Sequence, residues 1–348
     1  MTRVAHSDRM PRRTFLRHTA VSLLAMTARV PKRVTEVAAQ EAKSIVIDCH
    51  VHLVRKAFPG RGLQAHYTWH EYDGDLFVAE MNRAGVDKGL LKSYSPKDLQ
   101  YVTLQTLPGG ASALDTSEEY MVQWAKKYPE RLLWMDVFNP KDDDMNQWKE
   151  KIKDPLLKGL SFYPTNFYPS GYGLTHRYYI EILELAIEQG KKPVMITFEQ
   201  TPPDQRTARL KDWVELVRRF GPKLHWDVMH GGYWRRGPGQ LDRKALVEAV
   251  QELNAEYNNV WFGTAGERDE YPYIEWQEKV HALAEEIGND KIVWASDWPY
   301  VDAFHKYFQL IEAVRRHADW LSQREKQWFL GENAARFMNL PEAKPWAG

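Results

Sequence analysis

The sequence has a single cysteine, no net charge and no long apolar run after its amino-terminal segment. Each of these features limits the structures or partners that the protein can have. Cys49 has no partner in the chain, so an intrachain disulfide is excluded and either redox compartment suits it. The 47 basic and 47 acidic residues cancel, which gives no electrostatic case for nucleic acid or a membrane surface as a partner. No repeat, low-complexity tract or Pro/Ser-rich linker divides the chain.

The first 39 residues are expected to be an export signal rather than part of the fold. A paired arginine and an apolar pair in residues 12–17 precede a mildly apolar run over residues 20–28, in the order of a twin-arginine signal. This run is too short for a permanent membrane-spanning helix of about 20 residues. We predict a cut after Ala39 and therefore a periplasmic enzyme over residues 40–348; a basic, disordered arm is the alternative.

Short apolar runs alternate with helical periodicity along the rest of the chain. Eight runs have the pattern of buried strands, at Ile45–Val51, Lys88–Lys92, Leu132–Phe138, Gly159–Tyr163, Pro193–Phe198, Leu224–Met229, Val260–Thr264 and Ile292–Ser296. Helical periodicity covers Leu76–Ala84, Glu118–Lys127, Tyr179–Gln189, Ala208–Phe220, Arg243–Tyr257 and Trp276–Ile287. This alternation predicts an α/β fold, a (β/α)8 TIM barrel. A doubly wound open sheet is the alternative, and the lack of a Gly-rich phosphate loop after the first strand disfavours it.

The first predicted strand ends in His50-Val51-His52. Because side chains alternate along a strand, we expect Asp48, His50 and His52 on one face, and Cys49 and Val51 on the other. Two imidazoles on one face can hold a metal ion or a substrate oxyanion. Two unrelated histidines at the point where a strand surfaces are the alternative.

Polar residues also end most of the other predicted strands. In a barrel, these carboxyl ends carry the chemistry. The ends supply Lys92-Ser93-Tyr94, Ser161-Phe162-Tyr163, Thr197-Phe198-Glu199, His230, Thr264 with Glu267-Arg268, and Asp297. A barrel core packed only for stability does not need polar residues at these positions. We therefore expect a functional site at the end of the barrel where the strands have their carboxyl ends.

Several of these segments resemble the amidohydrolase superfamily, specifically its amidohydrolase-related (family 2) group. The similar segments are Asp48-Cys49-His50-Val51-His52, Ala84-Gly85-Val86-Asp87-Lys88, Lys158-Gly159-Leu160, Met229-His230-Gly231-Gly232, Ala295-Ser296-Asp297-Trp298-Pro299 and Leu330-Gly331-Glu332-Asn333-Ala334-Ala335-Arg336-Phe337. They span nearly all of the chain after the signal, in the family's order. The resemblance implies the barrel, one divalent metal ion with His50, His52 and Asp297 as ligands, and a hydrolase, decarboxylase or hydratase activity.

The sequence departs from this family at the fifth strand. The family usually has a metal-binding histidine where this chain has Thr197, a poor ligand for a transition metal. Glu199, two residues later, could replace it. We therefore expect His50, His52, Asp297 and Glu199 to hold one divalent metal, most simply Zn. The alternative is no metal at all, as in the metal-independent lactonases of the same group.

Residues at the strand ends also suggest catalytic and substrate-binding roles. Asp297 is the expected general base, and His230 the expected proton shuttle or carbonyl-polarising group. A turn cap and a structural histidine are the respective alternatives. We expect Arg235 and Arg268 to bind a substrate carboxylate, and Tyr163 and Trp298 to form an aromatic wall; solvated arginines and rim packing are the alternatives.

Taken together, these features predict a metal-dependent hydrolase of a small carboxylated or aromatic lactone, ester or amide. A non-oxidative decarboxylase or hydratase acting on an aromatic or dienoic acid is a second reading, and a metal-free lactonase-like hydrolase a third. A non-catalytic periplasmic binding protein would not require the full set of three histidines and an aspartate. The expected partner is a small-molecule substrate, and a homo-oligomer is left open.

Overall fold

The computed structural model describes residues 44–55, 71–93, 117–164, 171–198, 206–232, 241–265, 270–299 and 306–340. The predicted export signal and its cleavage site lie outside these residues. None of the helices in this described part combines the length and the hydropathy needed to cross a bilayer.

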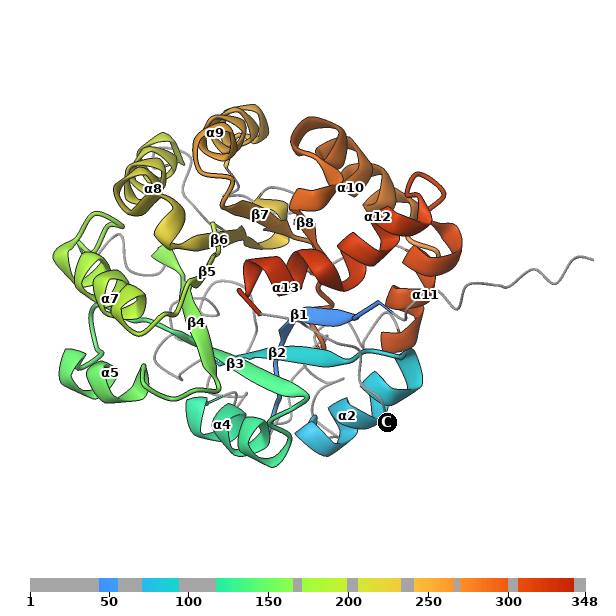
Figure 1. The fold of residues 1–348 in the computed structure, drawn as a ribbon, viewed down its shortest axis with the longest axis horizontal. Helices are drawn as coiled ribbons and strands as arrows, with labels where there is room; N and C mark the ends of the chain where they lie inside the picture. Colours follow the sequence, from blue (N-terminus) through green and yellow to red (C-terminus); the bar gives the residue numbers. More distant parts are fainter. Residues whose placement is uncertain are drawn as a thin grey trace, which may run out of the picture. The chain divides into compact units, whose positions relative to one another are not determined.

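Eight parallel strands, hydrogen-bonded in chain order, form the centre of the structure (Figure 1). They are β1 (Ile47–Val51), β2 (Lys88–Lys92), β3 (Leu132–Val137), β4 (Leu157–Phe162), β5 (Pro193–Ile196), β6 (His225–Val228), β7 (Val260–Gly263) and β8 (Ile292–Val293). Backbone bonds from the segment after β8 close the ring onto β1: Asp297 N–H donates to the His50 carbonyl (3.0 Å), and His52 N–H donates to the Trp298 carbonyl (2.7 Å). The predicted (β/α)8 TIM barrel is confirmed.

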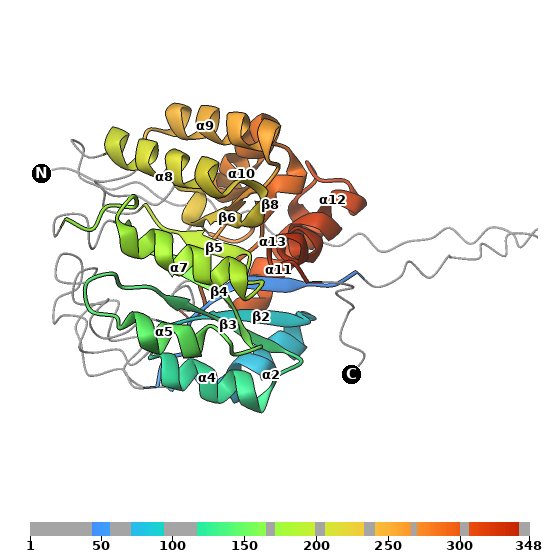
Figure 2. The same cartoon turned by 60° about the vertical axis from the view of Figure 1, so that its left-hand side comes forward.

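Helices connect the strands and surround them (Figures 1 and 2). They are α2 (Gly74–Ala84), α4 (Glu118–Lys127), α5 (Met145–Lys151), α7 (Arg177–Glu188), α8 (Arg206–Phe220), α9 (Arg243–Glu256), α10 (Ile274–Ile287), α11 (Tyr307–His317), α12 (Gln323–Gln327) and α13 (Asn333–Phe337), with one π-helical turn at Trp328–Glu332. Local signals fix several ends. Asp73 caps α2 by accepting from the Leu76 N–H, and Gly85 ends the same helix in the left-handed conformation, with φ of 67°.

Two apolar clusters fill the fold. The larger cluster lies between the strands and the helices, and it includes Leu91, Trp134, Phe162 and Trp226. The smaller one lines the barrel interior and includes Ile47, Cys49, Leu90, Met135 and Met195. Burial of each large apolar side chain contributes about 1.5–3 kcal/mol. Helix α13 crosses the middle of the ring of strands (Figure 1), and its Ala334 and Phe337 join the interior cluster. The amino-terminal mouth of the barrel is therefore closed by side chains.

The expected alternation along β1 is wrong. Cys49 packs in the barrel interior and Val51 in the outer cluster, although both were expected on the same face. Asp48 also faces away from the histidines, toward Ser296 and Tyr307. The cause is an irregularity in the pairing of β1 with β2 between Asp48 and Val51, because a bulge changes the phase of the side chains that follow it.

Candidate metal and catalytic site

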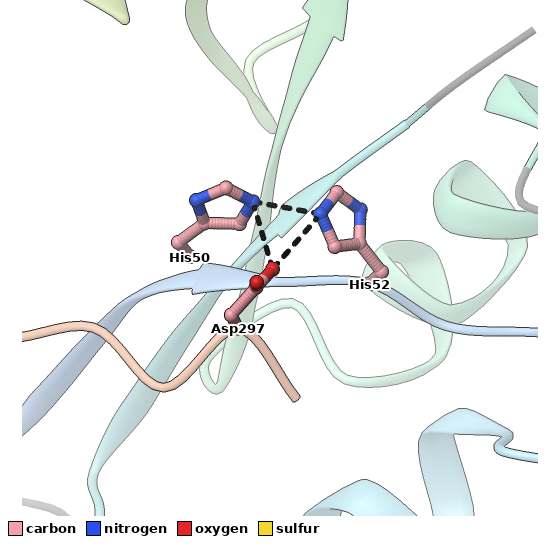
Figure 3. A group of neighbouring side chains, drawn as sticks. All are labelled: His50, His52 and Asp297. Atoms are coloured by element: carbon pink, nitrogen blue, oxygen red, sulfur yellow. Dashed lines mark hydrogen bonds and ion pairs between the residues drawn. The ribbon is translucent and has the colours of Figure 1, made fainter. Parts of the chain in front are cut away.

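Three buried side chains converge at the carboxyl ends of β1 and β8, namely His50, His52 and Asp297 (Figure 3). The two imidazole Nε2 atoms are 2.7 Å apart, and each lies 3.6 Å from Asp297 Oδ1. Two nitrogens this close cannot both present lone pairs to each other, so they share a proton or face a common cation. The arrangement is therefore suited to binding a cation.

Backbone geometry explains how these residues meet. His50 lies at the β1 irregularity, and Asp297 follows the short strand β8 with a left-handed φ of 61°. The expected catalytic histidine, His230, is also left-handed, with φ of 54°. Such conformations cost non-glycine residues of the order of 1–3 kcal/mol and persist where the surrounding structure holds them. Asp297 and His230 are both predicted to be catalytic, although Asn258, Tyr273 and Asn339, outside this group, are left-handed as well.

Hydrogen bonds to backbone carbonyls set the tautomers of two histidines. His52 Nδ1 lies 2.8 Å from the Lys92 carbonyl, and His230 Nδ1 lies 2.8 Å from the Ala265 carbonyl. A carbonyl can only accept, so Nδ1 carries the proton in each ring and the neutral ring presents an Nε2 lone pair. The rings of His230 and His50 have centroids 5.5 Å apart, and His230 is 3% exposed. His230 therefore belongs to the same buried group.

The three ligand atoms fit one metal ion. Their separations of 2.7, 3.6 and 3.6 Å define a point ~1.9 Å from all three, close to the ~2.0–2.2 Å bonds that Zn²⁺ makes to imidazole and carboxylate. Three protein ligands with one open position are typical of catalytic zinc. The His52 bond to the Lys92 carbonyl also supplies the outer partner that metal-binding imidazoles usually have. The group of His50, His52 and Asp297 is therefore able to hold a divalent metal.

Asp48, which the sequence analysis did not assign a role, joins the two segments that carry this group. Its carboxylate accepts from the N–H of Ser296 (3.0 Å), the hydroxyls of Ser296 (2.6 Å) and Tyr307 (2.9 Å), and the N–H of His50 (3.3 Å). Burial raises the pKa of Asp48 to about 6, against the lowering effect of these hydrogen bonds. Asp48 is thus a positioning residue for His50 and Asp297.

The remaining predicted site residues lie in different surroundings, and three of them are outside the described part of the chain. Thr197 is buried one residue after the end of β5. Tyr163 follows β4, and its ring lies 4.4 Å from Lys92 Nζ. The Trp298 ring is 1% exposed and packs with Tyr72 and Phe77 in the outer cluster. Its role in substrate binding stays a prediction. Glu199, Arg235 and Arg268 lie outside the described residues, so their roles also stay predictions.

Two further charged residues are buried beside this group: Lys92, which was expected at a strand end of the site but given no role, and Asp227, which was not predicted for the site. Both are 0% exposed. Burial raises the pKa of Asp227 to about 7, opposed by the Lys92 ammonium and by the Gly263 backbone N–H. The sequence does contain a signal for their importance. Each is a charged residue within an apolar strand pattern, at a position where packing alone favours Val, Ile or Leu.

Comparisons with known proteins agree with this architecture. A family model described as Amidohydrolase matches residues 47–340. No curated protein is significantly similar to the chain.

Solved structures share the fold at low identity. A probable 2-pyrone-4,6-dicarboxylic acid hydrolase from Acinetobacter baumannii, with citric acid bound, is 14% identical with a TM-score of 0.58, over 85% of this chain and 99% of that chain. An amidohydrolase from Burkholderia multivorans with bound zinc is 14% identical with a TM-score of 0.56, over 86% and 100%.

A 5-carboxyvanillate decarboxylase from Novosphingobium aromaticivorans, in complex with manganese and 4-hydroxy-3-methoxy-5-nitrobenzoic acid, is also similar. It is 14% identical with a TM-score of 0.56, over 86% of this chain and 97% of that chain. Identities this low show the fold alone. The family match, by contrast, covers most of the sequence, including both histidines and the aspartate of the metal-binding group, and the chain therefore belongs to the amidohydrolase family.

Proposed function

We propose that this protein is a metal-dependent hydrolase of a small carboxylated or aromatic lactone, ester or amide. The observation that carries the proposal is the convergence of His50, His52 and Asp297 on one point at the carboxyl mouth of the barrel. The similar structures support it, since one is named a pyrone dicarboxylate hydrolase and others hold zinc or manganese. We propose zinc as the metal.

Each side chain of the group has its own role in hydrolysis. The metal, held by His50, His52 and Asp297, would supply Lewis-acid polarisation of the scissile carbonyl. The second oxygen of the Asp297 carboxylate takes the proton of the attacking water as general base. The Ala265 carbonyl holds His230 through Nδ1, so its Nε2 can carry a proton for the leaving oxygen or nitrogen. Because all four residues are at most 3% exposed, bulk water is largely excluded from these steps.

A non-oxidative decarboxylase is the second candidate. The structural likeness to 5-carboxyvanillate decarboxylase favours it, with a TM-score close to that of the hydrolase. In that reaction a proton is delivered to the ring carbon as CO₂ leaves, and the same Asp297 and His230 would be the proton carriers.

Turnover of two compounds separates these activities. We expect the purified protein to open the ring of 2-pyrone-4,6-dicarboxylate with release of acid, whereas a decarboxylase would release CO₂ from 5-carboxyvanillate. Asp297→Asn keeps the size of the side chain and removes the base, so we expect turnover to fall by at least ~10²-fold. The matched control is Asp87→Asn, which alters an equally buried aspartate that accepts from the Val46 N–H just before β2. Near-normal turnover in Asp297→Asn would exclude Asp297 as the base.

A further inference from the structure

The barrel interior next to the proposed site contains a polar layer. Lys92 on β2 pairs with Met135, while Ser161 on β4 and Asp227 on β6 both pair with Met195. Paired residues of neighbouring parallel strands point to the same face of a sheet. Because Met135 and Met195 pack in the interior cluster, Lys92, Ser161 and Asp227 also point into the barrel.

This layer carries two opposite charges with no exposure to solvent. Lys92 and Asp227 are both 0% exposed, and the Lys92 ammonium lies over the Tyr163 ring at 4.4 Å. The Asp227 carboxylate lies so close to Gly263 that a Cβ atom at position 263 would be 2.9 Å from Asp227 Oδ2. TIM barrels normally fill such layers with branched apolar side chains. Because burying charged groups costs free energy, a lysine and an aspartate in such a layer call for a functional reason.

Two buried hydroxyls lie on the same inner face. Ser161 is 0% exposed and Thr197 is 1% exposed, and neither Oγ nor Oγ1 has a hydrogen-bond partner among the described residues. Thr197 follows Met195 by two residues, so it shares its inward direction. Buried hydroxyl groups in native structures are nearly always hydrogen-bonded. The two donors therefore indicate a ligand that brings acceptor oxygens.

The layer is attached directly to the metal-binding group. The Lys92 carbonyl accepts from His52 Nδ1 at 2.8 Å, so β2 and β1 end side by side here. We propose that Lys92, with the hydroxyls of Ser161 and Thr197, binds the carboxylate of the substrate and so determines specificity for acids. The inference rests on the proposed function, because it takes the His52 and Asp297 group as the reacting centre.

Asp227 completes this account of the layer. Its carboxylate attracts the Lys92 ammonium across the layer without a direct hydrogen bond, and so offsets part of that buried charge when no substrate is bound. The arriving carboxylate adds acceptor oxygens on the side of the hydroxyls. An ammonium has three donors, so it can donate to the oxygens of the substrate carboxylate. Lys92 is therefore a specificity-determining residue in addition to the four at the mouth.

The test is a binding measurement that needs no turnover. Calorimetric titration compares 4-hydroxy-3-methoxy-5-nitrobenzoic acid with its methyl ester on wild type, Lys92→Met and Lys88→Met. Lys88 is the matched control, because it lies at the opposite end of the same strand and donates to the Glu130 carbonyl. We expect Lys92→Met to weaken the acid about 10- to 100-fold and to leave the ester unchanged. Lys88→Met should bind both compounds like the wild type.

A double variant, Lys92→Met with Asp227→Asn, guards against misfolding because it removes both buried charges together. It too should bind the ester and lose the acid. The proposal is overturned if Lys92→Met loses the acid and the ester equally, or if Lys88→Met has the same effect as Lys92→Met. It is also overturned if the wild type binds the acid no better than the ester, or binds neither. Absence of hydrolysis would count against the proposed function alone, since no reaction step enters this measurement.

Discussion

Replacing Asp48 by Asn should weaken metal binding while leaving the fold intact. Asp48 accepts from four donors that belong to Ser296, Tyr307 and His50, and it thereby links the segments that carry the two kinds of ligand. Outer partners of this kind typically change metal affinity 10- to 100-fold when they are removed. We expect a loss in that range for zinc, with a parallel loss of turnover.

The stability cost of Asp48→Asn follows from two opposing effects. Hydrogen bonds to a charged group contribute about 1.5–3 kcal/mol each, and the variant loses the charge from all of them. Against this, the pKa of about 6 already combines burial with these hydrogen bonds, so the ionised carboxylate still destabilises the folded state by about 3 kcal/mol, a cost that a neutral amide does not have. The hydroxyls of Ser296 and Tyr307 can also turn to accept from the new amide. Because these effects oppose each other, we expect Asp48→Asn to remain folded under native conditions.

The assay pairs a competition titration for zinc with urea unfolding followed by tryptophan fluorescence. Asp87→Asn is the matched control, because Asp87 is 2% exposed and accepts from Val46 N–H away from the metal-binding group. It should alter stability without altering zinc affinity. Wild-type zinc affinity and turnover in Asp48→Asn, or an equal loss in Asp87→Asn, would refute the positioning role.

Three further predictions concern other parts of the chain. Thr197→His should tighten zinc binding by about tenfold or more in a competition titration, because it adds an imidazole where the family usually has one; an unchanged Kd would contradict this. The folded state raises the pKa of Asp227 from the ordinary 3.8 to about 7. In urea unfolding, the wild type should therefore lose about 2–3 kcal/mol of stability relative to Asp227→Asn as the pH rises from 5 to 7, and little more above pH 7. A stability difference that does not depend on pH would contradict this. Replacing Arg12 and Arg13 by Lys should leave the protein in the cytoplasm on fractionation, whereas unchanged periplasmic delivery would show that the signal was misread.

Periodicity predicted the barrel because each element has the pattern that its burial demands. Lys88–Lys92 and Glu118–Lys127 were predicted with the bounds that β2 and α4 have in the structure. Strand β8 was predicted to continue to Ser296 but ends at Val293, because the following residues leave the ladder to bond with β1 and Asp48. A departure of this kind depends on partners that are distant in the sequence.

The site was predictable in its residues but not in its supports. His50, His52, His230 and Asp297 come together as expected, because strand ends of a barrel meet at one mouth. The bulge in β1 was not predictable, since nothing in a strand of five apolar and polar residues specifies where the pairing slips. Asp48 therefore faces Ser296 and Tyr307 instead of the histidines, where it holds the two segments together.

The most direct test of the central claim is the metal content of the purified protein, measured together with its activity before and after chelation. We expect one divalent metal ion per chain, activity that is lost with the chelator and restored by zinc, and little metal in His50→Ala or His52→Ala. Stoichiometric metal in these variants would contradict the ligand assignment. A wild type that is free of metal and still turns over its substrate would contradict metal-dependent hydrolysis, and would leave the histidines and Asp297 as oxyanion and base residues only.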